Sequence, residues 1–234
     1  MVEIIAAMAV GLIMLTAIYA AVNSAQHSSS GIERKVIAQQ DVRSVLELMA
    51  MEIRMASYDQ NMNTSIWVKP TDCKTRPADN PSYKGIQEAG PFNITIEMDI
   101  NDNSVIDDTS SNSNETIKYV YQSLNQYISR STNCGNGNPL LGDNTAGQKT
   151  VRVINDQNGN GAYDVGTDVP VFRYFNGAGT EIFPGTTPAE IPNIRTIEIT
   201  LVVETEEVDP STKQRRKMVY STRVIPRNHA IVMQ

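Results

Sequence analysis

The sequence predicts an α+β protein in which one long N-terminal helix packs on an antiparallel β-sheet head. Three observations lead to this prediction. An uncharged apolar run opens the chain, an amphipathic helical pattern follows it, and the rest is rich in turns and alternating strands. We therefore divide the chain into a helix over residues 1–58 and a β-rich globular head over residues 59–234.

The apolar run extends from Ile4 to Val22 without a charge. As a helix it is about 28 Å long, close to the thickness of the hydrocarbon core of a bilayer. We expect residues 1–23 to lie in a membrane. A cleaved signal peptide and a plain signal anchor remain alternatives, but both usually carry basic residues near the run, and the first basic residue here is Arg34.

The helix is expected to continue over residues 24–58 and to pack on the head. Apolar residues recur there mostly at helical spacing, with charged residues between them. Ser28 to Gly31 are poor helix formers and predict a hinge. The apolar stripe consists of Ile32, Val36, Val42, Val45, Leu46, Met49, Ile53 and Met55.

Beyond Tyr58 the pattern changes to short strands. Alternation predicts strands over residues 92–98, 197–201 and 218–225. Two hairpins are predicted, one joining residues 116–120 to 127–131 and one joining 171–175 to 180–182. The late strands flank an acidic and then basic loop, residues 204–217, which we interpret as a solvated hairpin tip.

The N-terminal string Met-Val-Glu-Ile-Ile-Ala-Ala-Met-Ala-Val-Gly-Leu-Ile resembles the start of mature type IV pilins and type II secretion pseudopilins. The order of the later segments, YVYQSLNQYISR, VFRYFNGAGTEI, IPNIRTIEITLVV and STRVIPRNHA, is similar to that of PilW-type minor pilins. The J-type minor pseudopilins share much of this layout. The helix-breaking proline of many major pilins is missing, since the first proline is Pro70.

This resemblance implies a structural subunit, a minor pilin of a bacterial type IV pilus, and not an enzyme. Such a subunit helps to initiate filament assembly or forms the tip and adhesive surface. The alternatives are a minor pseudopilin of a type II secretion system and a main subunit of a pilus-like filament. The implied partners are other pilins in a helical filament, the inner-membrane assembly platform and the prepilin peptidase.

The resemblance also gives Glu3 a role in assembly. In pilins the matching glutamate is thought to pair with the N-terminal amine of a neighbouring subunit, and a buried carboxylate is tolerable only when paired. A prepilin cleavage site, with N-methylation of the new first residue, is expected upstream of Met1. The implied location is the inner membrane, with a single pass and a periplasmic head, and then the extracellular pilus at the cell surface.

Charge and histidine content restrict the other function classes. The net charge of −6, with a pI near 5.0, argues against a nucleic-acid partner. The two histidines, His27 and His229, are interpreted as surface or packing residues. A separate possibility, an anchored periplasmic binding module or enzyme, would need a pocket with convergent polar groups, and no motif in the sequence predicts one.

The two cysteines, Cys73 and Cys134, lie in the polar part of the chain. An oxidising compartment favours a disulfide between them over two free thiols. Closing about sixty residues would stabilise the fold by about 4 kcal/mol in the chain-entropy model.

Two segments resemble EF-hand-like calcium loops, in which oxygen ligands recur at alternate positions and a glycine at the sixth makes a sharp turn. The first has Gly161 at the sixth position, and the second has Ser104 there, which makes it the weaker candidate. Asn, Asp and Gly are also ordinary turn residues, which is the alternative reading. We expect structural Ca²⁺ of weak affinity. The ligands of the first loop are Asp156, Asn158, Asn160, the carbonyl of Ala162, Asp164 and Asp168. Those of the second loop are Asp99, Asn101, Asn103 and Asp107.

Overall fold

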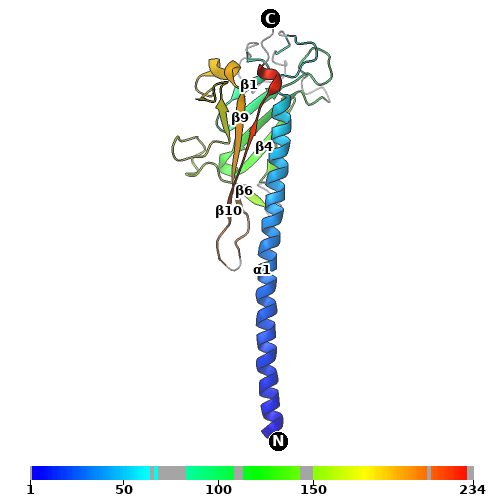
Figure 1. Ribbon diagram of the computed structural model, residues 1–234, viewed down its shortest axis with the longest axis vertical. Helices are drawn as coiled ribbons and strands as arrows, with labels where there is room; N and C mark the ends of the chain where they lie inside the picture. The colour runs from blue at the N-terminus through cyan, green and yellow to red at the C-terminus, as the bar shows by residue number, and fades with distance from the viewer. Residues whose placement is uncertain are drawn as a thin grey trace.

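The computed structural model describes residues 2–63, 66–67, 83–107, 113–142, 150–209 and 212–230. One helix, α1 (Val2–Met55), runs along the molecule. Its C-terminal half lies against the head, and its N-terminal half projects away from the head into open space (Figure 1). The predicted fold class, a long helix packed on antiparallel sheet, is confirmed.

The hinge predicted at Ser28 to Gly31 is wrong, because α1 passes through this segment without a break. The hydroxyl of Ser30 donates to the carbonyl oxygen of His27 at 3.0 Å, within the helix itself. Serine and glycine each lower helix stability by about 0.5–1 kcal/mol, and long helical flanks on both sides outweigh that effect.

The head contains two five-stranded antiparallel sheets, so the single sheet expected from the sequence is in fact a pair. The first sheet has the order β1 (Ile86–Ala89), β2 (Asn93–Glu97), β3 (Thr116–Gln122), β4 (Tyr127–Thr132) and β5 (Asn138–Leu141). The second has the order β10 (Lys217–Val224), β9 (Thr196–Thr205), β7 (Phe172–Phe175) and β8 (Glu181–Ile182), with β6 (Val151–Val153) also paired to β9. Three 3₁₀ helices complete the described head: η2 (Ser123–Asn125), η3 (Pro188–Asn193) and η4 (Arg227–Ala230).

Both predicted hairpins are confirmed. Strands β3 and β4 pair over six residue pairs around η2, and Gln126 closes the turn with a φ of +57°. Strands β7 and β8 pair around the turn of residues 176–179, in which the N–H of Asn176 donates to the carbonyl oxygen of Thr180 at 2.9 Å. Strands β9 and β10 pair over eight residue pairs on either side of the predicted solvated tip.

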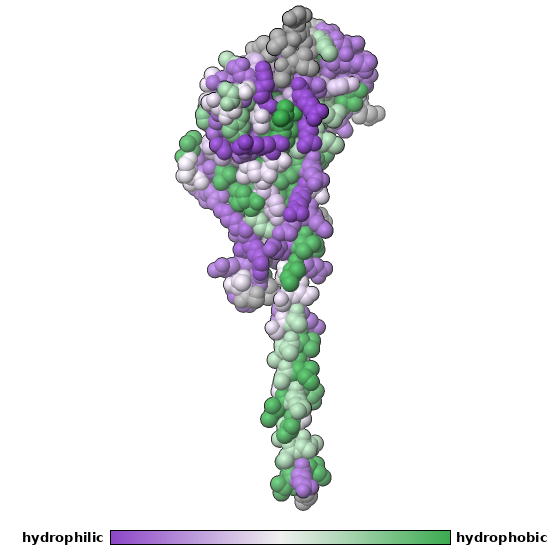
Figure 2. Space-filling view, in the orientation of Figure 1, coloured by the Kyte–Doolittle hydropathy of each residue, from purple (hydrophilic) through white to green (hydrophobic). Residues whose placement is uncertain are grey.

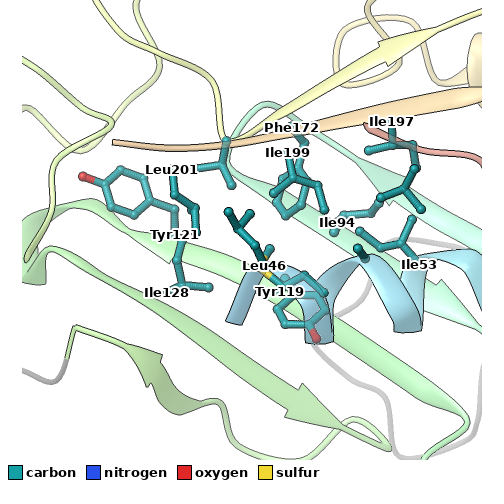
Figure 3. Close-up of a cluster of buried hydrophobic side chains, with 14 of the residues drawn as sticks. Leu46, Ile53, Ile94, Tyr119, Tyr121, Ile128, Phe172, Ile197, Ile199 and Leu201 are labelled. Carbon is teal, nitrogen blue, oxygen red and sulfur yellow. The ribbon is translucent and has the colours of Figure 1, made fainter. Parts of the chain in front are cut away.

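The core is one hydrophobic cluster to which α1 and both sheets contribute. Figure 3 shows Leu46 and Ile53 of the helix between Tyr119 of the first sheet and Ile199 of the second. The buried apolar residues of α1 are Ala38, Val42, Val45, Leu46, Met49, Ala50 and Ile53. Three residues of the predicted stripe do not belong to this face: Ile32, Val36 and Met55 are 62%, 44% and 37% exposed.

One polar contact inside this interface fixes α1 on the first sheet. Arg130 of β4 donates to Glu52 of α1 through two bonds, Nε to Oε2 at 3.1 Å and Nη2 to Oε1 at 2.6 Å. The hydroxyl of Tyr119, on β3, donates to the same carboxylate. Burial, followed by the charge of Glu52, raises the pKa of Tyr119, so this hydroxyl remains a donor.

Candidate functional site

The projecting half of α1 presents a large apolar surface that the head does not bury. Its residues from Val2 to Ser29 are all exposed, and most of them are apolar (Figure 2). By length and composition it could cross a membrane, a test that a signal sequence also passes. Glu3 lies in its first turn, the one acidic residue there, and is exposed.

The first predicted calcium loop lies between β6 and β7, and a buried asparagine that the sequence did not single out fixes its base. Asn155 is fully buried. Its Nδ2 donates to the carbonyl oxygens of Val169 and Thr200, both at 2.9 Å, and its Oδ1 accepts from the N–H of Val202. The two ends of the loop are therefore tied together and to β9.

Asp156, the first predicted ligand, faces the inside of this loop. Its Oδ1 accepts from the N–H of Gly159 at 2.6 Å, and its Oδ2 accepts from the N–H of Gly161 at 2.9 Å and from the hydroxyl of Ser123. Both glycines have positive φ, +69° and +86°, as the tight loop requires. Burial would raise the pKa of Asp156, but these hydrogen bonds outweigh it and lower that pKa, which keeps the carboxylate charged.

The middle of the loop is built from side chains that bond to the backbone two residues ahead. The Oδ1 of Asn158 accepts from the N–H of Asn160 at 3.0 Å, and the Oδ1 of Asn160 accepts from the N–H of Ala162 at 2.8 Å. Both asparagine amides also donate to Oδ2 of Asp164, each at 2.6 Å. Two amide N–H groups thus direct their partial positive charge at one carboxylate oxygen, much as a bound cation would direct its charge.

Asp168, the last predicted ligand, ties the end of the loop to its earlier residues. Its Oδ1 accepts from the N–H of Gln157 and its Oδ2 from the N–H of Asp164, both at 2.8 Å. The carboxylate is 7% exposed. The predicted side-chain ligands of the first loop are therefore joined by hydrogen bonds within one loop, but its three aspartates, all among the described residues, do not place their oxygens within 4.8 Å of one another.

The second loop, between β2 and β3, has the same bonding scheme. The buried Asp99 accepts at Oδ1 from the N–H of Asn103 at 3.2 Å and at Oδ2 from the N–H of Ser104 at 2.9 Å. Ser104 has a φ of +61° and so takes the left-handed conformation that Gly161 takes in the first loop. The serine at the sixth position therefore does not prevent the loop conformation.

The asparagines of the second loop repeat those of the first. The Oδ1 of Asn101 accepts from the N–H of Asn103 at 3.0 Å, and the Oδ1 of Asn103 accepts from the N–H of Val105 at 2.9 Å. The Nδ2 of Asn101 donates to Oδ2 of Asp107 at 2.8 Å, as Asn158 donates to Asp164. The two loops thus share most of these bonds. They differ in that Asp156 binds the N–H of the fourth position and Asp99 that of the fifth. In the first loop Asn160 also donates to Asp164.

Glu115 closes the second loop, in the role that Asp168 has in the first. Its Oε1 accepts from the N–H groups of Ile100 and Asn101, and its Oε2 from the N–H of Asp107 at 2.9 Å. Burial raises the pKa of Glu115 more than these hydrogen bonds lower it. The sequence did not indicate this residue, because it follows Asp99 at a longer distance than Asp168 follows Asp156.

The second loop also gathers more negative charge than expected. Asp59, just after α1, joins Asp99 and Asp102, and one oxygen from each lies within 4.8 Å of the others. Asn61 bridges the group, with its N–H donating to Asp59 at 2.9 Å and its Nδ2 donating to Asp102 at 2.8 Å. Among the described residues this is the one trio of acidic, histidine or cysteine side chains so close together, so the loop with the weaker sequence signal has the denser carboxylates.

A cavity of about 360 Å³ lies beside the end of the first loop. Its walls are largely apolar and include Tyr163, Phe172 and Phe183. Its charged groups, Arg173 and Glu181, bind each other through two hydrogen bonds of 2.8 and 2.6 Å. Because Arg173 and Glu181 bind each other, they are not free polar groups that converge on a ligand. Convergent free polar groups are the feature expected of a catalytic pocket.

The remaining predicted residues are placed as follows. His27 is exposed on α1 and His229 is buried, as interpreted from the sequence. Cys134 lies in the turn after β4 with a φ of +62°. Cys73 lies outside the described residues, so the disulfide between them stays a prediction. Comparison of the chain with family models, curated proteins and solved structures finds no match.

Proposed function

We propose that this protein is a structural subunit of a type IV pilus, a minor pilin that helps to initiate the filament or forms its tip and adhesive surface. The observation that carries the proposal is the projecting half of α1, which is mostly apolar and has no buried residue. The role is that of a building block, and it requires no catalytic group.

The exposed apolar surface of α1 supports this role. Burying one large apolar side chain contributes about 1.5–3 kcal/mol, and the segment from Ile4 to Val22 presents many of them to solvent. A lipid bilayer and a bundle of identical helices both remove that surface from water. A filament subunit uses the two environments in succession, first the inner membrane and then the filament core.

Glu3 supports the filament stage in particular. A carboxylate within a bilayer is unfavourable by about 3 kcal/mol on insertion scales, so its position before the apolar run needs a compensating partner. In the monomer Glu3 is exposed. The free N-terminal amine of an adjacent subunit, at the same depth, is such a partner.

The test of this role is a comparison of Glu3→Ala with Glu33→Ala, a change of the same kind at an exposed residue beyond the apolar run. We expect Glu3→Ala to insert into the inner membrane at the normal level and to be missing from sheared filaments. Glu33→Ala should be incorporated normally. Normal incorporation of Glu3→Ala would refute the assigned role, as measured by immunoblots of the membrane and filament fractions.

Mass spectrometry of the mature N-terminus separates the larger classes. Protein from sheared surface filaments should begin upstream of Met1 with an N-methylated residue, as the pilin resemblance implies. A protein confined to the inner membrane with an unprocessed start would instead be an anchored periplasmic protein. A processed protein that co-purifies with a secretion machine would be a minor pseudopilin.

We also propose that both loops bind Ca²⁺. Carboxylate, amide and carbonyl oxygens are the donors that this hard ion accepts together, and both loops have them at the same positions. The residues that would hold it are Asp156, Asn158, Asn160, Ala162, Asp164 and Asp168 in one loop, and Asp99, Asn101, Asn103 and Asp107 in the other. Amides at two positions imply the weak affinity of extracellular modules, about 10⁻⁴–10⁻³ M, so the ion would stabilise the head.

A further inference from the structure

The hairpin between β9 and β10 lies beside α1 and points toward the N-terminus of the helix (Figure 1). Two contacts define how far along α1 the hairpin reaches. The guanidinium of Arg34 lies 2.5 Å from the carboxylate of Glu207, and a Cβ on Gly31 would lie 3.8 Å from Oδ2 of Asp209.

This level places the hairpin tip near the surface of a membrane. Gly31 follows Val22, the end of the apolar run, by nine residues, or about 14 Å of helix. The headgroup layer occupies about 5–7 Å on each side of the hydrocarbon core. The N–H of Lys213 donates to the carbonyl oxygen of Asp209 at 2.8 Å, so Lys213 lies at this same level. When Ile4 to Val22 spans the core, this level is about 7–9 Å outside the headgroup layer, which is within a Debye length and within the reach of a long basic side chain.

Three acidic residues near the end of this hairpin are already paired. Glu206 accepts from Arg152 of β6, with Nη2 to Oε1 at 2.8 Å. Glu207 pairs with Arg34 of α1, and Asp209 pairs with Arg216 across the hairpin at 2.7 Å. Their negative charge is therefore compensated by arginines.

The cations at the tip are not compensated in this way. Lys213 is exposed, the guanidinium of Arg215 donates to a backbone carbonyl, that of Glu206, and the ammonium of Lys217 donates to the amide oxygen of Gln157. Within the described part of the chain, none of the three has a carboxylate partner. Lys217, the first residue of β10, lies opposite Glu204 and reaches back to the head. Lys213 and Arg215 therefore provide the uncompensated positive charge at the end of the hairpin, on a protein whose net charge is −6.

We propose that this hairpin tip binds the anionic phospholipid headgroups of the bilayer that holds α1. The inference rests on the proposed membrane insertion of α1 and adds a second contact between the protein and the membrane. Anionic surfaces attract clustered Lys and Arg within about a Debye length, and salt weakens the attraction. The contact would hold the head at one height and rotation until the subunit leaves the membrane for the filament.

The test uses the full chain in nanodiscs of phosphatidylcholine, with and without phosphatidylglycerol, and measures amide hydrogen exchange of residues 212–216. We expect at least threefold slower exchange in the anionic nanodiscs at low salt, and no difference at 0.5 M salt. Equal exchange in the two lipid compositions would overturn the inference. Amides of β3 and β4 serve as an internal control for the fold of the head.

Two charge reversals at opposite ends of the head sharpen the test. Lys213→Glu, alone or with Arg215→Glu, should abolish the lipid-dependent protection, whereas Arg227→Glu, an exposed residue of η4, should leave it unchanged. Loss of protection in Arg227→Glu would mean that overall charge, and not the tip, is responsible. Protection that appears only in assembled filaments would show that the tip binds another subunit, and would overturn the membrane inference.

The same preparation distinguishes the inference from its premise. If α1 does not hold the chain in the nanodiscs, the proposed membrane insertion itself is wrong. If the chain is held and the tip exchanges equally with both lipids, only the hairpin inference is lost.

Discussion

At the scale of single residues, His229 is a buried polar group whose protonation affects stability. Its Nε2 lies 2.9 Å from the carbonyl oxygen of Ile191, to which it donates, and its Nδ1 accepts from the hydroxyl of Ser57 at 3.0 Å. The same hydroxyl accepts from the N–H of Gly85 at 3.0 Å. All acceptors and donors of the neutral ring are satisfied, so the ring is bound in its uncharged form.

This arrangement makes the head sensitive to acid. Burial, together with the charges of Lys84 and Arg195, lowers the pKa of His229 to about 4. In the unfolded chain the pKa is 6.5. Because the native pKa is depressed, the contribution is complete above pH 6.5 and is lost as the pH falls through 6.5 toward 4. The shift corresponds to about 3 kcal/mol over that range.

We expect the free energy of unfolding, measured by denaturant titration of the full chain in detergent, to fall between pH 7 and pH 4. His229→Gln should reduce this pH dependence by about that amount, while lowering stability at pH 7. His27→Gln, at the exposed histidine of α1, should change neither. An unchanged pH dependence in His229→Gln would contradict the assigned protonation state.

At the scale of elements, the two loops share most of their hydrogen-bonding pattern. Each has a first aspartate that binds backbone N–H groups, two asparagines that bind the backbone two residues ahead, and a distant carboxylate that closes the loop. The closing residues, Asp168 and Glu115, each bind the N–H of the second and the ninth positions. The carboxylates of each loop are therefore held inside it by hydrogen bonds to the loop's own backbone.

Calcium should stabilise the head by binding to these loops. At ten times its dissociation constant, an ion that binds only the folded state adds about 1.4 kcal/mol per site. We expect the thermal midpoint of the full chain in detergent to rise with millimolar Ca²⁺ relative to a chelator, and Mg²⁺ to have less effect. Asp164→Ala and Asp107→Ala should each remove one part of the calcium-dependent increment.

The quantity that decides is the calcium-dependent rise in the thermal midpoint, and not the stability of each variant without calcium. Both aspartates also bind asparagine amides, so each variant loses a hydrogen bond even without the ion. Asp41→Ala, at a helix residue outside both loops, controls for loss of a carboxylate. If the double variant Asp164→Ala/Asp107→Ala keeps the full increment, calcium does not bind at these loops.

The sequence predicted the elements with strong periodic patterns. Strand β9 was expected over residues 197–201, where it alternates, and it extends to residues 196–205. Strands β1, β5 and β6 were not expected, because Ile-Gln-Glu-Ala, Asn-Pro-Leu-Leu and Val-Arg-Val are too short to show a period. In the loops, the aspartates and asparagines that recur at alternate positions were singled out from the sequence. Asn155, Glu115 and Asp59 were not, because their roles depend on tertiary neighbours that are distant in sequence.

At the scale of the whole molecule, α1 belongs to two structures. From Ala38 onward it supplies one wall of the common core, and before Ser30 it contributes no buried residue to the head. The contacts of the helix with the β9–β10 hairpin begin at Gly31 and Arg34. The second half of the helix is therefore part of the fold of the head, and the first half is free for the role in assembly or membrane insertion that we propose for it.

This separation predicts the behaviour of a truncated chain. A protein comprising residues 30–234 keeps every buried residue of α1 and both of its contacts with the hairpin. We expect it to unfold cooperatively, with a free energy of unfolding within about 1 kcal/mol of the full chain in detergent, since the removed residues lose no packing. In phase partition with detergent, the truncated protein should stay in the aqueous phase and the full chain should not.

A charge within the projecting segment provides the matched control in the full chain. Ile13→Lys, at the middle of the apolar run, is unfavourable in a bilayer by about 3 kcal/mol and should reduce the membrane-bound fraction while leaving the unfolding of the head unchanged. A truncated chain that fails to fold would show that the projecting half supports the head. An Ile13→Lys chain that inserts normally would show that the segment lies in a different environment. Either result would disprove the division of α1 into an assembly half and a folding half, because that division requires both effects to be local.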